Sequence, residues 1–165
     1  MIKTILKGWW LGIHRLRSLQ DYQRLQIFLA EATVAELKAK GIDLSAASVL
    51  ELGAGVGGYS LVLNRESRSF LATDMQKDLW LNGDEVPFQQ VDVLRPFPFE
   101  DDSFDLVYCS SLIEHIPEAG NMLDESWRVL KPGGVLYLSF PPFYSLAMIG
   151  GHLFKPFHFL GERLA

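Results

Sequence analysis

The 165-residue sequence contains a single cysteine, Cys109, so these residues form no internal disulfide framework and suit a reducing compartment. Basic residues are also few: 15 lysines and arginines stand against 20 aspartates and glutamates, for a formal net charge of -5. Proteins that bind nucleic acids need clustered lysine and arginine against the phosphate backbone. We therefore expect no nucleic-acid partner and a cytoplasmic location.

Long uninterrupted hydrophobic runs are missing as well. A membrane-spanning helix needs about 20 largely apolar residues, and residues 140–160 hold too many breakers for one. The breakers are Pro141, Pro142, Gly150, Gly151, Lys155 and Pro156. The apolar start of the chain is interrupted at Lys7 and Gly8, unlike a signal peptide. Residues 1–18 instead form a basic amphipathic arm, which either packs on the domain or touches an anionic membrane surface.

The composition that remains is that of one globular domain, with 48% hydrophobic and 21% charged residues. Apolar residues at helical spacing from Leu25 to Leu37, followed by Gly41, predict a helix over residues 19–40. We divide the domain into an N-terminal helical segment (1–47), a core (48–141) and an aromatic tail (142–165).

Short β-rich runs alternate with helical stretches through the core. The β-rich runs are residues 48–52, 69–73, 87–91, 104–109 and 134–140, and the helical stretches are residues 57–66, 76–82 and 117–131. Strands that alternate with helices form βαβ units and a parallel sheet. The sequence therefore predicts an α/β fold, a Rossmann-like three-layer αβα sandwich whose mostly parallel sheet has five recognisable strands.

The most informative segment is Val49–Gly58, where an apolar run ends in an acid and breaks into alternating glycines. Glycine permits φ > 0 and lets a ligand approach where a Cβ would collide. A buried strand followed by such a loop and a helix builds a nucleotide-sized crevice in α/β sheets. Gly53, Gly55 and Gly58 also fit the dinucleotide pattern G-x-G-x-x-G, so an NAD-dependent oxidoreductase stays an alternative.

Acidic residues follow the first three predicted strands: Glu51, Asp74 and Asp92. The carboxyl ends of the strands of a doubly wound sheet open on one rim, so the three acids should converge there. Asp74, which lies 21 positions after Gly53, can accept two hydrogen bonds from a ribose diol and would repel a 2′-phosphate. An acid at Glu51 suits a cationic ligand better than a pyrophosphate, and Asp92 is placed to reach an adenine amino group.

Several motifs together resemble the class I S-adenosylmethionine-dependent methyltransferases, and more narrowly their small-molecule branch, such as quinone-precursor and sugar methyltransferases. The resemblance covers about residues 48–141, in the order and spacing of the family. Its motifs are Val49–Tyr59, Thr73–Met75, Val91–Val93, Pro96–Val107, Leu112–Ile116 and Arg128–Gly134. It implies a cofactor-binding core, the cofactor S-adenosyl-L-methionine, the product S-adenosyl-L-homocysteine and a small-molecule methyl acceptor.

The resemblance also assigns roles to residues of this sequence. Around the methionine part lie the loop residues Gly53, Ala54, Gly55 and Gly57, with Glu51 near the ammonium end. On the nucleoside side it places Asp74 at the ribose and Met75, Asp92 and Val93 at the adenine, with Ser110 near the reacting methyl. Two of these acids have plain structural alternatives: Glu51 as an acid that staples the loop, and Asp92 as a cap or turn residue.

Methyl transfer from a sulfonium is an in-line displacement that needs no covalent enzyme intermediate, and alignment of donor and acceptor supplies much of the rate. An oxygen acceptor must lose a proton, and His115 is the candidate base. Its alternative is a structural, hydrogen-bonded histidine. His152 and His158 lack nearby carboxylate or thiolate partners in the sequence, so we expect no metal site. The acceptor's identity, and whether O, N or C is methylated, stay open.

The sequence departs from the family at its end. The family's sheet has seven strands, yet only 25 residues follow Phe140, too few for a helix and two paired strands. We therefore expect the last two strands to be missing and the edge of residues 135–140 to be covered by the tail or by a second copy of the chain, as in a homodimer. A remnant that binds cofactor without catalysis is the alternative function.

Overall fold

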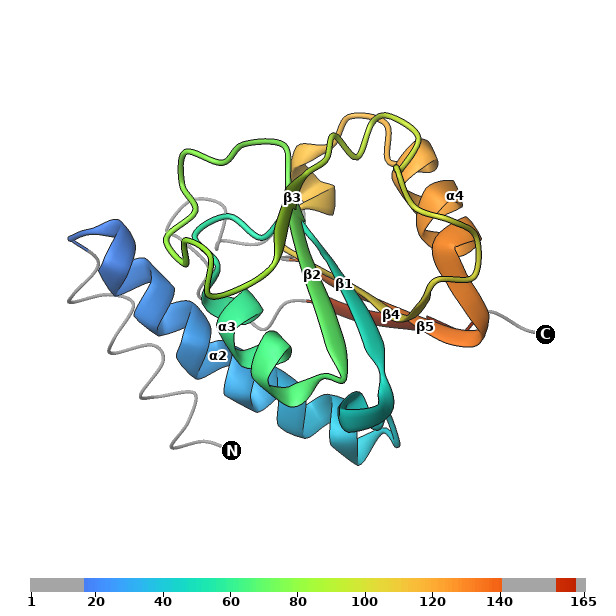
Figure 1. The fold of residues 1–165 in the computed structure, drawn as a ribbon, viewed down its shortest axis with the longest axis horizontal. Coiled ribbons are helices and arrows are strands. Elements are labelled where there is room, and N and C mark those ends of the chain that lie inside the picture. The colour runs from blue at the N-terminus through green and yellow to red at the C-terminus, as the bar shows by residue number, and fades with distance from the viewer. Residues whose placement is uncertain (1–16, 141–156, 163–165) are drawn as a thin grey trace.

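A computed structural model describes residues 17–140 and 157–162 (Figure 1). A long helix, α2 (Leu19–Ala39), precedes the sheet and confirms the helix predicted over residues 19–40. Ser18 caps it, because the Ser18 Oγ accepts a hydrogen bond from the Asp21 N–H at 3.1 Å. The elements that follow are η1 (Leu44–Ala46), β1 (Ser48–Leu52), α3 (Gly58–Glu66), β2 (Ser69–Asp74), β3 (Phe88–Gln90), β4 (Phe104–Ser110), η2 (Ile113–His115), α4 (Gly120–Val129), β5 (Leu130–Phe140) and β6 (Phe157–Glu162).

The six strands form one sheet in the order β3-β2-β1-β4-β5-β6. The first five are parallel to one another, as the alternation of strands and helices predicts. After β1 the chain adds β2 and β3 on one side, and it then returns to place β4 on the other side of β1. The strand order therefore reverses between β1 and β4, and ligands of open α/β sheets bind at the carboxyl ends of the strands at such a point.

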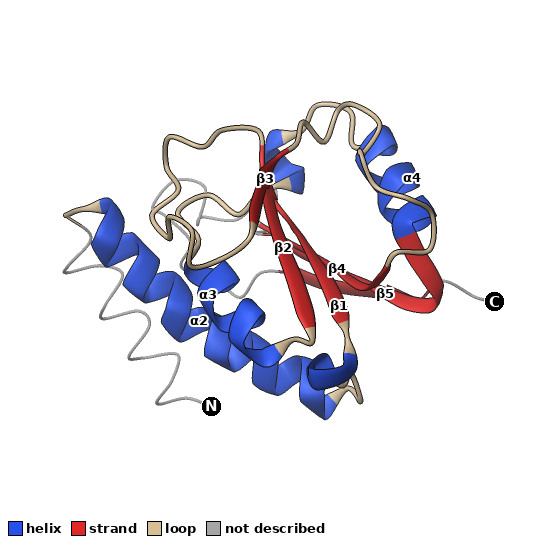
Figure 2. Ribbon diagram, in the orientation of Figure 1, coloured by secondary structure: helices blue, strands red, loops and turns tan. Residues whose placement is uncertain are grey.

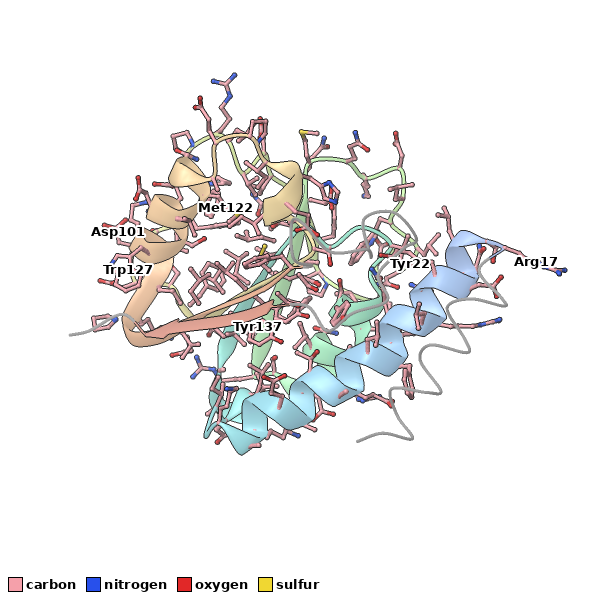
Figure 3. All side chains as sticks on the ribbon, turned by 180° about the vertical axis from the view of Figure 1, so that it is seen from behind. Arg17, Tyr22, Asp101, Met122, Trp127 and Tyr137 are labelled. Carbon is pink, nitrogen blue, oxygen red and sulfur yellow. The ribbon has the colours of Figure 1, made fainter. Side chains whose placement is uncertain are left out.

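Helices cover both faces of the sheet, α2 and α3 on one face and α4 on the other (Figure 2). Successive strand residues alternate between two hydrophobic clusters: Leu106 and Tyr108 join the cluster that includes α2 and α3, while Val107 and Cys109 join the one that includes α4. Viewed from behind, fully buried Met122 of α4 and Tyr137 of β5 lie within these layers (Figure 3). The three-layer αβα sandwich is confirmed.

The tail contributes a strand of its own. β6 pairs antiparallel with β5, from Val135↔Glu162 to Phe140↔Phe157. The expectation that the tail covers the β5 edge is confirmed, since the backbone groups of β5 find partners there. This sixth strand was not among the five that the sequence analysis predicted. The run of Phe157, Phe159 and Leu160 supplies β-forming residues after the breakers that the tail contains.

The helix predicted over residues 76–82 is wrong, because this segment forms turns between β2 and β3. Its polar side chains bond to the nearby backbone in place of a helical ladder: the Trp80 indole N–H donates to the Gly83 carbonyl at 3.0 Å. Gly83 has a φ of 54°, which helical residues do not adopt. Trp80 is buried, with its ring centroid 4.7 Å from that of Phe88.

The last predicted helix and strand exist with shifted bounds. The helix α4 is shorter than the predicted 117–131, and β5 begins at Leu130, ahead of the predicted residue 134. Leu130 pairs with Phe104 and Val135 with Leu106, so the register shifts across residues 131–134. The Lys131 Nζ binds the Asp105 Oδ2 at 2.8 Å across this irregularity.

Residues 1–16 of the N-terminal arm (1–18) lie outside the described residues, so both interpretations of the arm stay untested. Within residues 17–140 and 157–162, no helix is long and apolar enough to cross a bilayer.

Candidate functional site

The glycine loop lies at the carboxyl end of β1, where the strand order reverses. Gly53, Gly55 and Gly57 have φ angles of 74°, 54° and 81°, a region that other residues rarely adopt. Space is also short: a Cβ at Gly57 would lie 2.3 Å from the Asn82 Nδ2, and one at Gly53 would lie 2.9 Å from the Leu112 side chain. The loop therefore requires glycine at 53 and 57 for two reasons, and at 55 for its backbone conformation alone.

Asp74, at the end of β2, joins the glycine loop directly. Its Oδ2 accepts a hydrogen bond from the Gly55 N–H at 2.9 Å, and its Oδ1 accepts one from the Gln76 N–H at 2.9 Å. The neighbouring Thr73 carbonyl accepts from the N–H groups of Gly53 and Ala54, both at 2.9 Å. A carboxylate oxygen has two lone pairs, so both oxygens can still accept a bond from a ligand.

Glu51 is buried beneath this loop, with 3% of its surface exposed. The Ser60 hydroxyl of α3 donates a hydrogen bond to its Oε2, so Glu51 ties β1 to α3. Burial raises the pKa of the carboxyl to about 7, with a smaller contribution from the charge of Asp74, and the bond from Ser60 offsets part of the rise. At neutral pH this carboxyl is therefore poised to become charged when a cation arrives.

The predicted adenine residues line the ends of β2 and β3. Met75 is 54% exposed, and its carbonyl accepts a hydrogen bond from the Gln90 Nε2 at 2.7 Å, which holds the two strand ends together. Asp92 acts as a turn residue, the alternative weighed for it, because its Oδ1 accepts from the Leu94 N–H at 2.9 Å. Val93 is half-buried against the α4 face of the core.

The segment after β4 contains His115, the predicted base, and two residues that were not predicted as site residues, Ser111 and Glu114. Ser111 has a φ of 53°, and its N–H donates to the Ser139 carbonyl at 2.7 Å. Within the described residues, neither buried carboxylate oxygen of Glu114 has a hydrogen-bond partner. His115 is exposed, and no hydrogen bond of its imidazole to another described residue is present. Strained backbone and unpaired buried groups cluster at sites that bind ligands or do chemistry.

Tyrosines around Ser110 were missed by the sequence reasoning. The ring centroids of Tyr59 and Tyr108 lie 5.6 Å apart, and Tyr108 stacks on Tyr137 at 5.1 Å. Burial raises the pKa of Tyr59 to about 12, and the Ser110 hydroxyl beside it offsets part of that rise. These phenols are therefore neutral, and they form an aromatic wall beside Ser110. The sequence offers little signal for them, since aromatic residues on strands and helices usually belong to the core.

Cys109 does not act as a nucleophile in this arrangement. Its thiol is buried, and burial raises its pKa to about 12, with further contributions from the carboxylates of Glu114 and Glu51. A thiol with so high a pKa carries almost no thiolate at neutral pH. Among the described residues, no group of three or more histidine, cysteine, aspartate or glutamate side chains could hold a metal ion.

The sequence reasoning also missed three amide side chains that hold the glycine loop. The Gln23 Nε2 donates to the Val56 carbonyl at 3.0 Å, the Asn82 Nδ2 donates to the Gly57 carbonyl at 2.8 Å, and the Gln26 Oε1 accepts from the Gly58 N–H at 3.1 Å. Gln23 and Gln26 belong to α2, more than 30 residues earlier in the chain, and no local pattern reveals such contacts.

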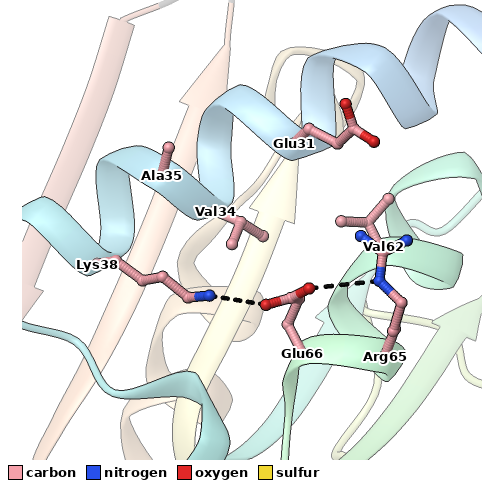
Figure 4. Close-up of a pocket in the computed structure, with 7 residues that line it drawn as sticks. All are labelled: Glu31, Val34, Ala35, Lys38, Val62, Arg65 and Glu66. Atoms are coloured by element: carbon pink, nitrogen blue, oxygen red, sulfur yellow. Dashed lines mark hydrogen bonds and ion pairs between the residues drawn. The ribbon is translucent and has the colours of Figure 1, made fainter.

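A shallow groove of about 230 Å³ lies between α2 and α3 (Figure 4). Glu66 accepts from the Lys38 Nζ at 2.7 Å and the Arg65 Nε at 3.3 Å across it. Arg65 and Glu66 lie at the C-terminal end of α3 and Lys38 lies in the last turn of α2, whereas the glycine loop leads into the N-terminal end of α3. The groove is therefore separate from the rim, and its exposed ion pairs are typical of a solvated helix contact.

The fold, the glycine loop and the acids at the strand ends are typical of an α/β domain that binds a nucleotide-like ligand. The methyltransferase domain family matches residues 50–138, which is more than half of the sequence. The chain belongs to this family.

Individual relatives agree with this assignment. The chain is 33% identical over 121 residues to a ubiquinone biosynthesis O-methyltransferase of Xanthomonas oryzae pv. oryzae, covering 66% of this chain and 51% of the relative. A ubiquinone biosynthesis O-methyltransferase of Pseudomonas entomophila is 25% identical over 160 residues, covering 90% of this chain and 66% of the relative. The chain thus spans about half to two thirds of the length of these relatives.

Solved structures show the same architecture. A protein of Pyrococcus horikoshii matches with a TM-score of 0.63 and 28% identity, over 80% of this chain and 63% of its own. Phosphoethanolamine N-methyltransferase 2 of Haemonchus contortus, solved in complex with S-adenosyl-L-methionine, matches with a TM-score of 0.57 and 25% identity, over 67% of this chain and 28% of its own.

Proposed function

We propose that the chain is an S-adenosyl-L-methionine-dependent methyltransferase that acts on a small-molecule acceptor. Membership of the methyltransferase domain family supports this function. The main support for this function is that two acids lie around one glycine loop. Glu51 is buried, and Asp74 keeps free lone pairs with which it could accept hydrogen bonds from a ribose. S-adenosyl-L-methionine offers an ammonium and a sulfonium to the first and a ribose diol to the second.

The backbone donors of the loop favour this cofactor over a dinucleotide. A pyrophosphate binds the free N–H groups of a glycine loop and of the helix N-terminus behind it. Here the side chain of Asp74 accepts a hydrogen bond from the N–H of Gly55, and that of Gln26 accepts one from the N–H of Gly58, the first residue of α3. Thr73 takes those of Gly53 and Ala54. An NAD-dependent oxidoreductase therefore fits this loop poorly.

The roles of the individual residues follow from their positions. Glu51 faces the ammonium end, Gly53, Ala54, Gly55 and Gly57 form the floor under the methionine part, and Asp74 holds the ribose. Met75, Asp92 and Val93 surround the adenine, with Asp92 acting partly through the turn that it fixes. Ser110 and the wall of Tyr59 and Tyr108 border the reacting methyl, where neutral phenols leave a site of low polarity.

Positioning and proton removal are the tasks of the protein in this reaction. When bound, the cofactor supplies a methyl group on a positively charged sulfur, which takes the electron pair of the broken C–S bond as the acceptor bonds the methyl carbon. Alignment of donor and acceptor contributes about 7–11 kcal/mol. His115 takes the proton that an oxygen acceptor must lose, because it follows β4 at the same rim and its imidazole is exposed.

The acceptor that we propose carries a phenolic or similar hydroxyl. The relatives from Xanthomonas and Pseudomonas are named as O-methyltransferases of ubiquinone biosynthesis. The alternative function from the sequence analysis, cofactor binding without catalysis, is separated from this one by experiment.

Two measurements test these proposals. Calorimetry with S-adenosyl-L-homocysteine and with NAD separates the cofactors: we expect binding of the first, and binding of NAD alone would overturn the proposal. Transfer of a labelled methyl group to a panel of phenols, sugars and quinone precursors then separates the enzyme from the remnant. Cofactor binding with no transfer to any acceptor would favour the remnant.

A further inference from the structure

Two amide side chains outside the glycine loop join its peptide groups to the rest of the rim. Gln23 of α2 donates from one Nε2 to two acceptors, the Val56 carbonyl at 3.0 Å and the Asn82 Oδ1 at 2.7 Å. Asn82 in turn donates from its Nδ2 to the Gly57 carbonyl at 2.8 Å. We call the side chains of Gln23 and Asn82 the amide latch.

The amide latch completes the hydrogen bonding of both peptide units that flank Gly57. In the first unit, the Val56 carbonyl binds Gln23 and the Gly57 N–H binds the Ala54 carbonyl at 2.9 Å. In the second, the Gly57 carbonyl binds Asn82 and the Gly58 N–H binds Gln26. Glycine has more conformational freedom than any other residue. Polar partners at both ends of each peptide unit remove that freedom before a ligand binds.

Burial makes these bonds more than surface contacts. Asn82 is 9% exposed, and Trp80 beside it is also 9% exposed, so water competes little for the amide. Hydrogen bonds are stronger in such surroundings, and an unmade one is more costly. Gly57 is also packed closely against Trp80, because a Cβ at Gly57 would lie 2.7 Å from the Trp80 ring.

The position of Asn82 gives the latch its consequence for function. Asn82 belongs to the turns between β2 and β3, the same connection that begins with Met75. The latch therefore ties the loop proposed to bind the methionine part to the connection proposed to bind the adenine. It also brings in α2, which lies outside the part of the chain that the family matches.

We propose that Gln23 and Asn82 are positioning residues that pre-organise the two halves of the cofactor site as one unit. This inference rests on the proposed function. A ligand that spans both halves gains most from the latch, because without it binding must order two loops. A ligand that occupies the adenosine half alone must order only one.

The test compares two ligands, S-adenosyl-L-homocysteine and adenosine, on the full chain and its variants. Asn82→Ala removes the centre of the latch, and Gln23→Met keeps the shape and helix propensity of its side chain while removing its donor. Gln20→Ala is the matched control, since Gln20 is an exposed glutamine three residues earlier on α2. Calorimetry gives each Kd, and urea unfolding of each variant shows whether it is folded.

We expect each latch variant to raise the Kd of S-adenosyl-L-homocysteine about tenfold, since each loses one hydrogen bond to a loop carbonyl and the bond between Gln23 and Asn82. The Kd of adenosine should rise less than threefold. The double variant should fall well short of the hundredfold product, because the two side chains bind each other. Gln20→Ala should leave both constants unchanged. Should Asn82→Ala not fold, Gln23→Met alone carries the comparison.

Two outcomes would overturn the inference. One is an unchanged Kd of S-adenosyl-L-homocysteine in the latch variants, and the other is an equal rise for both ligands, which would mark general loosening. Failure of the proposed function looks different, since the unaltered chain would then not bind S-adenosyl-L-homocysteine at all.

Discussion

The two sides of the rim differ in how far their polar groups are satisfied. On the side proposed to bind the cofactor, which we call the cofactor side, the backbone groups of the glycine loop bind Asp74, Thr73, Gln26 and the amide latch. On the other side, after β4, Glu114 keeps two buried oxygens without a partner in the described residues, and Ser111 holds a strained φ of 53°. The first side is built before a ligand arrives, whereas the second has unpaired groups that a ligand could satisfy.

This difference fits the division of labour in a methyltransferase. A shared cofactor calls for a rigid, reusable site, because pre-organisation lowers the entropy cost of binding. An acceptor site has to supply chemistry, and strained or unpaired groups are found where chemistry occurs. Substitutions on the cofactor side should therefore change affinity for the cofactor, and those after β4 should change turnover.

The largest effect should come from His115→Ala. Loss of a general base lowers kcat by about 10²–10⁴-fold, while the Kd of S-adenosyl-L-homocysteine should stay within about twofold. Methyl transfer to a phenolic acceptor and calorimetry measure the two quantities. Glu114→Gln, which keeps the shape of the neighbouring carboxyl, is the matched control and should cost less. A large loss in Glu114→Gln with none in His115→Ala would place the proton on Glu114 and contradict the assignment.

Gly57→Ala should have the next largest effect and should act on the cofactor side. The alanine would occupy a φ of 81° with its Cβ 2.3 Å from the Asn82 Nδ2, so the loop must shift. We expect a loss of about 3 kcal/mol in folding stability or cofactor affinity, from overpacking added to backbone strain. Gly55→Ala is the control: it has a φ of 54° but nothing within 4 Å of its Cβ.

The strain alone at Gly55 should cost about 1–2 kcal/mol. Urea unfolding and calorimetry of both variants give the comparison. Equal losses at the two glycines would mean that the close approach of Asn82 and Trp80 contributes nothing.

The cofactor side was also the more predictable from sequence. Gly53 and Asp74 could be placed because each follows a strand whose end lies on a known rim, so a local pattern fixes their position. Gln23 and Asn82 could not be, because they meet across 59 residues of chain. A glutamine on a helix is usually part of the solvent-exposed face. The neighbouring sequence does not distinguish the few glutamines whose side chains point toward the core.

The errors of the sequence analysis have physical causes as well. Residues 76–82 have helix-forming composition around Leu79, yet Trp80 and Asn82 are drawn into the core and bind backbone groups there. Tertiary contacts outweigh local propensity in so short a segment. β6 was missed because proline and glycine in the tail hid a short apolar run, and an unpaired edge offers any such run backbone partners.

Asp74→Ala should weaken cofactor binding by about 2–3 kcal/mol. The variant loses the charge-assisted bonds proposed to the ribose diol, and it frees the Gly55 N–H that Asp74 now holds at 2.9 Å. Calorimetry with S-adenosyl-L-homocysteine measures the loss. Asp92→Ala serves as the comparison on the same rim and should cost less, because Asp92 is engaged in a turn. An unchanged affinity in Asp74→Ala would show that the cofactor lies elsewhere.

The smallest effect is a pH dependence set by Glu51. Its pKa in the folded chain is about 7, raised by burial from an ordinary 4.5, so the folded state holds the proton more tightly than the unfolded state. Stability from this group is therefore full below pH 4.5, falls as pH rises toward 7 and is level above it. The affinity for a cationic ligand should instead increase as pH rises through 7. The ionised carboxyl attracts the ammonium directly, whereas the neutral carboxyl must first lose its proton.

We expect the Kd of S-adenosyl-L-homocysteine to rise about tenfold between pH 8 and pH 6, as one proton becomes linked to binding. At pH 6 the heat of binding should also depend on the ionisation enthalpy of the buffer, because the released proton passes to it. Glu51→Gln, which can still accept from Ser60, should remove both effects. If the variant keeps the same pH dependence, the titrating group is not Glu51. The ligand would then bind without a change in the ionisation of this buried carboxyl.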